Sequence, residues 1–366
     1  MQIDMPDTSP NAKPPPGTSY QIECENLWKV FGENPEKALE AIKSEGLGKD
    51  EAQERFNCII GVADVSLQIR SGEIFCIMGL SGSGKSTLLR HVNRLIEPTA
   101  GRLKINGRDV SQMDAAGLRQ LRSETIGMVF QHMALWPHKT IQGNVAYGLE
   151  VRGIDRKSRD EAASKALEQV QLAGWESHYP DELSGGMQQR VGLARALAAN
   201  PDILLMDEPF SALDPLIRSD LQGQFLELSA RLQKTTIFIT HDLEEAIRMG
   251  HRVAIMKDGV IVQVGTPEEI VTNPQGDYVK KFVEGISRLR FLTADRVMAS
   301  LQDQAEEQGL SEGESATCIR PGDGLYAIID ALQRAQGTVW VDDGTGKVGK
   351  ITPAALLDSI KQFTLR

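Results

Sequence analysis

Gly79-Leu80-Ser81-Gly82-Ser83-Gly84-Lys85-Ser86-Thr87 fits the pattern G-x-x-x-x-G-K-[ST], which is typical of a loop that wraps a phosphate chain. Its glycines let backbone N–H groups converge on phosphate oxygens without Cβ clashes, and a helix that follows directs its positive end at the anion. We expect the Lys85 ammonium to reach the β and γ phosphates and the Ser86 hydroxyl to ligate Mg²⁺. The predicted phosphate-binding residues are Gly79, Ser81, Gly82, Ser83, Gly84, Lys85, Ser86 and Thr87.

Short apolar runs around this loop predict a parallel sheet. Residues 73–78 precede the loop, and a helical pattern over 86–95 follows it. Two further runs, 203–206 and 236–239, are β-prone and too short for helices. Apolar runs without alternation, separated by helical segments, indicate a buried parallel sheet covered by helices. The sequence therefore predicts an α/β fold in which the phosphate loop joins a strand to a helix.

An acidic pair, Asp207 and Glu208, directly follows the run 203–206. At the end of a buried strand Asp207 is expected to hold Mg²⁺, and Glu208 to face the γ-phosphate and polarise the attacking water. An acidic pair in this place could also cap the next helix. The phosphate loop favours the catalytic interpretation, because a nucleotide-hydrolysing site needs both parts.

Two helical insertions are expected in this α/β framework. Residues 157–172 have apolar positions at helical spacing, and the segment from about 121 to 189 is predicted to be a helical subdomain. Between 33 and 59, Asn34-Pro35 opens a helical pattern over 36–43, and Asp50 is expected to cap a second short helix. We interpret 33–59 as an inserted helical hairpin.

The composition bounds the class of protein. The 366 residues are 41% hydrophobic and 25% charged, as in globular proteins, and the net charge of -10 argues against nucleic acid as a partner. The four cysteines form no CxxC pair, so neither a zinc site nor a redox motif is indicated. Residues 1–20 are polar and proline-rich and are expected to be a flexible arm. Since no window offers the about 18 continuous apolar residues of a membrane span, a membrane role requires a partner.

The run Leu183-Ser184-Gly185-Gly186-Met187-Gln188-Gln189-Arg190 resembles the signature motif of ABC proteins. It is a second cradle for phosphate, made by Ser184, Gly185 and Gly186 before a helix. Two such cradles on one chain fit a head-to-tail homodimer, in which the signature of one copy closes on the ATP held by the other.

The other ABC motifs follow in the order that the resemblance implies. Gln131 matches the Q-loop, which in the family senses Mg²⁺ and faces the membrane partner. Asp214, in Ser211-Ala212-Leu213-Asp214, matches the D-loop of the dimer interface, and His241 matches the switch histidine that contacts the γ-phosphate. An aromatic residue stacks on adenine in the family; Phe31 aligns with it, and Trp28 is the alternative.

One cassette on a chain without membrane spans is the pattern of ABC importers. Ala134-Leu135-Trp136-Pro137-His138-Lys139-Thr140 resembles the segment that docks a coupling helix of the permease, with Trp136 as the expected contact. Residues 20–286 resemble the ATPase subunits of glycine betaine/proline betaine importers, which serve osmoprotection. The resemblance rests on the insertion after Phe31 and on the runs Asn93-Arg94-Leu95-Ile96-Glu97-Pro98 and Ser211-Ala212-Leu213-Asp214-Pro215-Leu216-Ile217-Arg218.

The last 80 residues resemble part of the CBS modules that such relatives carry. Leu292-Thr293-Ala294-Asp295-Arg296-Val297-Met298 is similar to a CBS opening, and 339–352 to the strand-turn-strand close of a repeat. We expect residues 287–366 to be a shortened or degenerate α+β CBS-like domain that serves dimerisation or stability. The cassette then spans residues 21–286.

The resemblance implies an ATP-hydrolysing subunit of an ABC importer for a quaternary amine such as glycine betaine, choline or proline betaine. Its expected cofactors are ATP and Mg²⁺, and its partners are a second copy, an integral membrane permease and, indirectly, an extracytoplasmic substrate-binding protein. It would lie at the cytoplasmic face of a bacterial inner membrane. The alternatives are another class of ABC importer and an ABC ATPase without a transport role.

Overall fold

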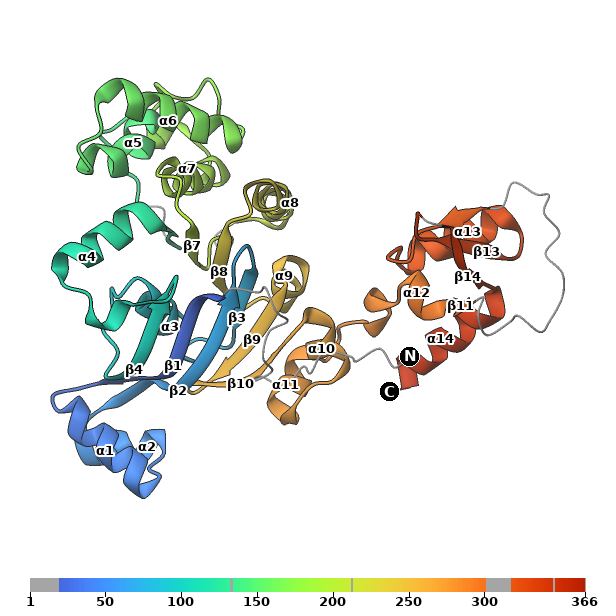
Figure 1. The fold of residues 1–366 in the computed structure, drawn as a ribbon, viewed down its shortest axis with the longest axis horizontal. Coiled ribbons are helices and arrows are strands. Elements are labelled where there is room, and N and C mark those ends of the chain that lie inside the picture. Colours follow the sequence, from blue (N-terminus) through green and yellow to red (C-terminus); the bar gives the residue numbers. More distant parts are fainter. Residues whose placement is uncertain (1–19, 132–133, 212, 301–316, 345, 366) are drawn as a thin grey trace. The chain divides into compact units, whose positions relative to one another are not determined.

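The computed structural model describes residues 20–131, 134–211, 213–300, 317–344 and 346–365. By their contacts the residues divide into two compact units, 1–270 and 271–366, which are coloured along the sequence in Figure 1. The sequence placed this boundary after residue 286, but helix α11 (Gly276–Val283) groups with the second unit. The expected arm lies outside the described residues except for Tyr20, which begins strand β1.

A six-stranded sheet in the order β10-β9-β3-β8-β7-β6 forms the centre of the first unit. Its strands are β3 (Ile74–Met78), β6 (Ile126–Val129), β7 (Ile203–Asp207), β8 (Thr235–Thr240), β9 (Arg252–Lys257) and β10 (Val260–Gly265). The predicted strands β3, β7 and β8 are confirmed; every residue of the three is buried, which explains why they lack alternation. They run parallel, so their carboxyl ends meet at one edge of the sheet.

A second, antiparallel sheet has the order β2-β1-β4-β5. Its strands are β1 (Tyr20–Phe31), β2 (Ile59–Arg70), β4 (Ala100–Ile105) and β5 (Arg108–Asp109). Helix α3 (Lys85–Val92) contributes Leu88 and Leu89 to the same hydrophobic core as Ile22 of the antiparallel sheet and Phe75 of the parallel one. The helix after the phosphate loop is therefore anchored in the core shared by both sheets.

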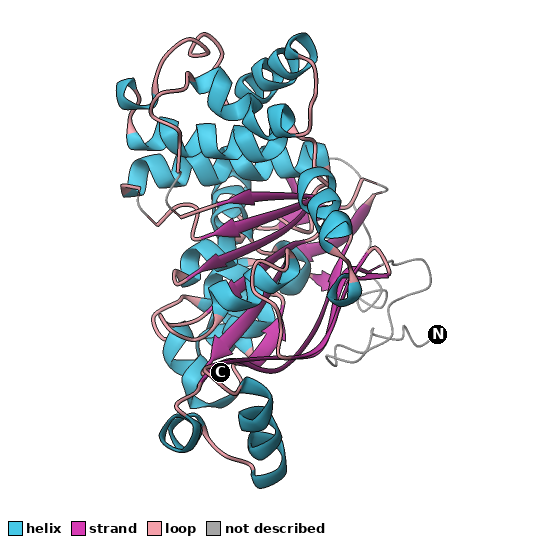
Figure 2. Ribbon diagram, turned by 90° about the vertical axis from the view of Figure 1, so that its left-hand side faces the viewer, coloured by secondary structure: helices cyan, strands magenta, loops and turns pink. Residues whose placement is uncertain are grey.

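Helices α5 (Ile141–Val151), α6 (Arg156–Gln169) and α7 (Gly185–Ala198) pack on one another and form a helical layer beyond the parallel sheet (Figure 2). The expected helical segment, about 121–189, needs correction at both ends. Residues 126–129 form β6, which pairs with β7, and α7 continues to Ala198. The strand was missed because four residues that include Gly127 give little periodicity. The first unit also contains α4 (Ala115–Gln120), α8 (Pro215–Leu232), α9 (Leu243–Met249) and α10 (Pro267–Thr272), which ends across the boundary.

The predicted helical hairpin is present as α1 (Pro35–Glu45) and α2 (Lys49–Phe56) between β1 and β2. Leu39 and Ile42 of α1 pack in a small core of their own with residues of both strands. Asp50 does not cap α2, because the helix begins one residue before it: Gly48 is the N-cap, and its N–H donates to Glu51 Oε2 at 2.9 Å.

The second unit contains a four-stranded sheet in the order β11-β14-β13-β12. Its elements are α12 (Ala294–Val297), β11 (Ala299–Ser300), β12 (Cys318–Ile319), α13 (Leu325–Ala335), β13 (Val339–Asp342), β14 (Lys347–Ile351) and α14 (Pro353–Leu365). The antiparallel pair β13 and β14 confirms the predicted strand-turn-strand. Within the described residues of the whole chain, no helix has the length and apolar character needed to cross a membrane.

Candidate nucleotide-binding and catalytic site

The predicted phosphate loop joins β3 to α3, as expected. Gly79 and Gly84 have φ angles of +157° and +101°, which L side chains rarely adopt. A Cβ at Gly79 would collide with the Met256 carbonyl oxygen, and one at Gly84 with the Gly61 carbonyl oxygen. Glycine is therefore required at both positions by backbone conformation and by the close approach of neighbouring backbone.

Lys85 is the first residue of α3, and its side chain folds back over the loop. Nζ donates to the carbonyl oxygens of Gly79 at 2.9 Å and Leu80 at 3.0 Å. Burial lowers the pKa of Lys85, while the nearby carboxylates of Glu208 and Asp207 act to raise it. The ammonium thus lies between the loop and the acidic pair, where it can reach a bound phosphate.

Two of the three predicted metal ligands, Ser86 and Asp207, are in contact although 121 residues separate them. Ser86 Oγ donates to Asp207 Oδ1 at 3.1 Å. A hydroxyl and a carboxylate are hard oxygen donors that suit Mg²⁺, which is usually held by one or two carboxylates together with substrate phosphates. Among the residues that the structure describes, no cluster of three or more His, Cys, Asp or Glu side chains forms a separate metal cage. The residues present therefore fit Mg²⁺ bound with a nucleotide.

Arg90 is a residue of this site that the sequence analysis missed. Its guanidinium donates to the other carboxylate oxygen of Asp207, Oδ2, at 3.1 Å. Arg90 stands four residues after Ser86 on α3, so both side chains emerge on one face of the helix. The four-residue spacing from Ser86 could have indicated that Arg90 belongs to the site, but only if it had been known that Asp207 faces α3.

Glu208 and His241 form a second contact at the same sheet edge. His241 Nδ1 lies 3.1 Å from Glu208 Oε2, and their side chains are 59% and 19% exposed. Glu208 follows β7 with a φ of +46°, and its N–H donates to Ile239 O of the neighbouring strand β8. Because β7 and β8 are adjacent and parallel, the residues that follow them meet, as the motif order implies.

The predicted Q-loop residue lies beside the D-loop. Gln131 Nε2 donates to Ser211 Oγ at 3.4 Å, and Ser211 Oγ in turn donates to the Glu208 carbonyl oxygen at 3.1 Å. Among the described residues no hydrogen bond joins Gln131 to Ser86 or Asp207. Gln131 is thus near the catalytic edge through Ser211 but is not in contact with the other predicted metal ligands.

The signature residues begin α7, with Ser184 as its N-cap: Ser184 Oγ accepts from Met187 N at 3.4 Å. A Cβ at Gly186 would lie 2.6 Å from Ile217 Cγ2 of α8, whereas one at Gly185 would meet no described atom within 4 Å. Asp214 caps α8, accepting from Ile217 N at 3.1 Å. No hydrogen bond or ion pair of the described residues joins Ser184, Gly185 or Gly186 to residues 79–87, so the two predicted phosphate cradles of one chain remain separate.

The two candidate adenine-stacking residues have different surroundings. Phe31, 38% exposed, ends β1, and its ring borders Gly61, whose carbonyl oxygen lies against Gly84 of the phosphate loop. Trp28 instead packs against the inserted hairpin, with Lys43 Nζ 5.2 Å from its ring centre. The geometry favours Phe31, since its exposed ring lies next to the phosphate loop.

A groove of about 600 Å³ adjoins the Q-loop, between β6 and the helical layer. Its lining includes the exposed apolar side chains Leu95, Phe130 and Val151, together with Tyr147. Trp136, 42% exposed, has its ring centre 5.6 Å from that of Tyr147, and its backbone N–H donates to Asn144 Oδ1 at 2.6 Å. The segment expected to contact a permease therefore lies beside an apolar groove.

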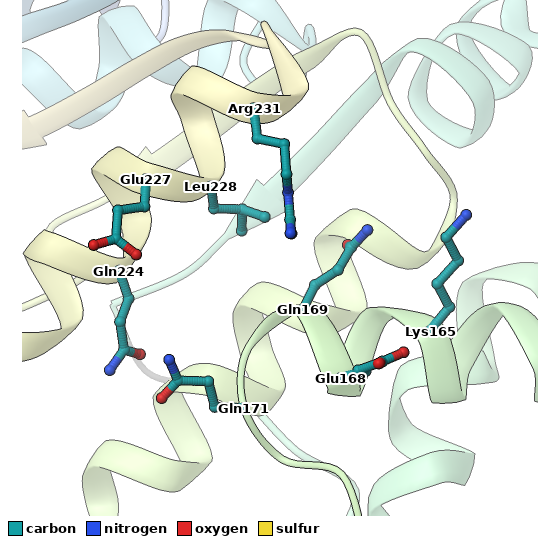
Figure 3. A pocket seen from close by; sticks show the side chains of 8 residues that line it. All are labelled: Lys165, Glu168, Gln169, Gln171, Gln224, Glu227, Leu228 and Arg231. Atoms are coloured by element: carbon teal, nitrogen blue, oxygen red, sulfur yellow. The ribbon is translucent and has the colours of Figure 1, made fainter.

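A separate hollow of about 710 Å³ lies between α6 and α8. Figure 3 shows the side chains that line it, which are polar except for one leucine and carry charges of both signs. They are Lys165, Glu168, Gln169, Gln171, Gln224, Glu227, Leu228 and Arg231. None of the predicted nucleotide-binding or catalytic residues belongs to this set.

Comparison with known proteins agrees with this geometry. The ABC transporter family model matches residues 62–211. Two solved dimeric ABC cassettes, one in a post-hydrolysis state with ADP and phosphate, superpose with a TM-score of 0.56 at 32% identity, covering 67% of this chain and 98% of theirs. The fold and the site thus define an ABC-type ATPase.

The curated relatives narrow the family. The glycine betaine/proline betaine transport ATP-binding protein ProV of Salmonella typhimurium is 55% identical over 87% of this chain and 84% of its own. The glycine betaine transport ATP-binding protein OpuAA of Bacillus subtilis is 48% identical over 88% of this chain and 77% of its own. The trimethylamine N-oxide transport ATP-binding protein TmoW of Pelagibacter ubique is 43% identical over 93% and 97%. The chain belongs to the ATP-binding subunits of the ABC importers that transport betaines and related methylated amines.

Proposed function

We propose that this chain powers the uptake of a quaternary or methylated amine as one half of an ATPase homodimer. The observation that carries the catalytic part is that Ser86 with Asp207, and Glu208 with His241, lie at one sheet edge beside the phosphate loop. A site that hydrolyses a nucleoside triphosphate needs a group that holds the metal ion and a group that orients the water, both beside the phosphates. The substrate rests on the relatives, whose names specify betaines and trimethylamine N-oxide.

Each residue has a defined part in the proposed reaction. Lys85 and the loop N–H groups bind the β and γ phosphates of ATP, and Phe31 stacks on its adenine. Ser86 and Asp207 would hold Mg²⁺, which when bound supplies positive charge against the phosphates in the transition state. Glu208 orients and polarises the attacking water, and His241 contacts the γ-phosphate and is held by Glu208. Gln131 links the site to the permease side.

The partner copy supplies the rest of each site. Ser184, Gly185 and Gly186 of one protomer close on the ATP held by the other, with Asp214 at the interface between them. This proposal is supported by the separation of the two cradles within one chain and by the dimeric state of the similar cassettes. Closure and reopening of the dimer would then move the permease subunits.

The groove beside Gln131 is the proposed docking place for a helix of an integral membrane permease. Its apolar side chains Leu95, Phe130 and Val151, with Trp136 nearby, suit an apolar helix face. In this arrangement the chain sits on the cytoplasmic face of the inner membrane of a bacterium. The transported solute would be bound by the permease and by an extracytoplasmic binding protein, and never by this chain.

The second unit is proposed to be a single CBS-like module that serves dimerisation or stability. Trimethylamine N-oxide, which the name of one relative specifies, is a second candidate solute beside glycine betaine. Deleting residues 287–366 should then leave ATP binding intact, because every predicted nucleotide-site residue lies before residue 287 and in the first unit.

Uptake measurements test the transport proposal. Osmotically stressed cells that depend on this chain would be given labelled glycine betaine, choline, proline betaine or trimethylamine N-oxide, with Lys85→Ala as the inactive control. We expect one or more of these solutes to accumulate with the native chain and none with Lys85→Ala. Equal uptake of all four solutes with both chains would refute the proposed substrates, but it would not contradict the proposal that the chain is an ATPase.

A further inference from the structure

Helices α8 and α9 are joined by a buried polar network that none of the predicted motifs includes. Its centre is Glu245, 6% exposed, beside Gln222, 4% exposed. Gln222 Nε2 donates to Glu245 Oε1 at 2.9 Å, and Arg248 donates to Gln222 Oε1 at 3.1 Å. Both ends of the Gln222 amide are therefore used, and its position relative to α9 is fixed.

The same carboxylate reaches the end of strand β8. Thr240 is 2% exposed, and its hydroxyl lies near the Glu245 carboxyl and accepts from Asp242 N at 3.0 Å, while Glu245 N donates to Asp242 Oδ1 at 3.3 Å. Burial raises the pKa of Glu245, and the hydrogen bonds from Thr240 and Gln222 oppose that rise. Thr240 and Asp242 flank His241, so Glu245 is connected to the residues on either side of it.

Asp242 also connects this network to the D-loop. Arg218, one turn into α8, donates to the Leu213 carbonyl oxygen at 3.0 Å and pairs with Asp242 Oδ2 at 3.4 Å. Asp214 begins the same helix as its N-cap. Because α8 is one continuous helix of 18 residues, we expect a displacement of the D-loop to be passed along it to Gln222.

We propose that Glu245 is a positioning residue for ATP hydrolysis: through Gln222 and Thr240 it couples the D-loop helix α8 to the segment that carries His241. The inference rests on the proposed roles of His241 and Asp214. A partner protomer that moves Asp214 would thereby move His241 toward or away from the γ-phosphate. Buried polar networks suit this task, since they hold one relative arrangement of two elements, whereas apolar packing tolerates sliding.

A matched control separates positioning from simple stabilisation. Glu73 is also 6% exposed, and it accepts from Arg252 Nε at 2.6 Å and from Arg70 N at 2.7 Å. It joins β3 to β9 and has no contact with His241 among the described residues. Glu73→Gln therefore perturbs an equally buried carboxylate without touching the coupling of α8 to α9.

The test compares Glu245→Gln, Glu73→Gln and the exchange variant Gln222→Glu/Glu245→Gln in steady-state ATPase assays. In Glu245→Gln an amide replaces the carboxylate facing Gln222, so we expect kcat to fall about ten-fold, which corresponds to about 1.4 kcal/mol, with an unchanged KM for ATP. In the exchange variant the amide at position 245 can donate to the carboxylate at position 222, which also accepts from Arg248, so kcat should be restored. Glu73→Gln should lower the Tm and leave kcat unchanged.

Two further measurements make the outcome decisive. Binding of a fluorescent ATP analogue should be the same in all variants, which shows that the fold and the phosphate loop are intact. His241→Ala is assayed in parallel: if it keeps its kcat, the proposed role of His241 fails and the coupling with it. If His241→Ala loses activity but Glu245→Gln does not, or if the exchange variant stays as slow as Glu245→Gln, the positioning role of Glu245 is refuted while the proposed site stands.

Discussion

The two signature glycines provide a matched pair of substitutions with opposite structural consequences. An alanine methyl at Gly186 would lie 2.6 Å from Ile217 Cγ2, so α7 and α8 must separate or Ile217 must leave its rotamer. An alanine methyl at Gly185 meets no described atom within 4 Å. Both positions are in the first turn of α7, so the gain in helix propensity from Gly to Ala nearly cancels in the comparison.

The difference between the variants is therefore the cost of overpacking, typically about 1–3 kcal/mol. For a domain of this size each kcal/mol shifts the Tm by roughly 2–4 °C, so Gly186→Ala should melt roughly 2–12 °C below Gly185→Ala. Circular dichroism melts of both proteins, without nucleotide, give this difference directly. Since Gly185 faces outward, its alanine variant should unfold at or slightly above the native Tm.

A double-mutant comparison checks the physical cause. Ile217→Ala removes the methyl group that the new side chain meets, so Gly186→Ala should cost less stability in the Ile217→Ala background than in the native one. Equal Tm values for Gly185→Ala and Gly186→Ala would refute the reasoning, as would a cost of Gly186→Ala that does not depend on Ile217.

Three other substitutions or reactions test separate parts of the structure. Phe31→Ala should raise the KM for ATP about ten-fold through lost stacking of about 1–1.5 kcal/mol, whereas Trp28→Ala should mainly lower the Tm; the opposite pattern would assign adenine to Trp28. Arg90→Ala should raise the Mg²⁺ concentration for half-maximal ATPase about ten-fold by releasing Asp207, and an unchanged or lower value would contradict an orienting role. A thiol reagent at pH 8 should label the exposed Cys318 and spare the three buried cysteines until the protein unfolds. Burial raises the pKa of the Cys24 thiol to about 12 and also raises the pKa of Cys76. Labelling of a second thiol in the native protein would contradict the burial of these cysteines.

The sequence predicted those parts of the fold whose physical signal is local. Strands β3, β7 and β8 are buried along their whole length, so their runs stand out without any knowledge of neighbours. Strand β6 was missed because Gly127 breaks its run. The glycine is explained only in three dimensions, since a Cβ there would lie 2.7 Å from the Ala196 carbonyl oxygen of α7.

In the candidate site, too, some contacts were predictable from motifs and others depend on three-dimensional packing. The contact of Ser86 with Asp207 across 121 residues was predictable, because both groups were expected to hold one metal ion. Arg90 belongs to no expected motif, and its pairing with Asp207 depends on how α3 lies over β7. Phe31 was preferred to Trp28 from the resemblance alone, and the packing of Trp28 against the inserted hairpin was not predictable from the sequence.

The central claim is that the catalytic site is completed by a second copy of this chain. Light scattering on Glu208→Gln, with and without ATP and Mg²⁺, tests it most directly, because slowed hydrolysis should trap the closed state. The account predicts a monomer without nucleotide and a particle of twice that mass with it, and no such change in Lys85→Ala/Glu208→Gln. A Glu208→Gln protein that binds ATP at full occupancy and stays monomeric would contradict the composite site.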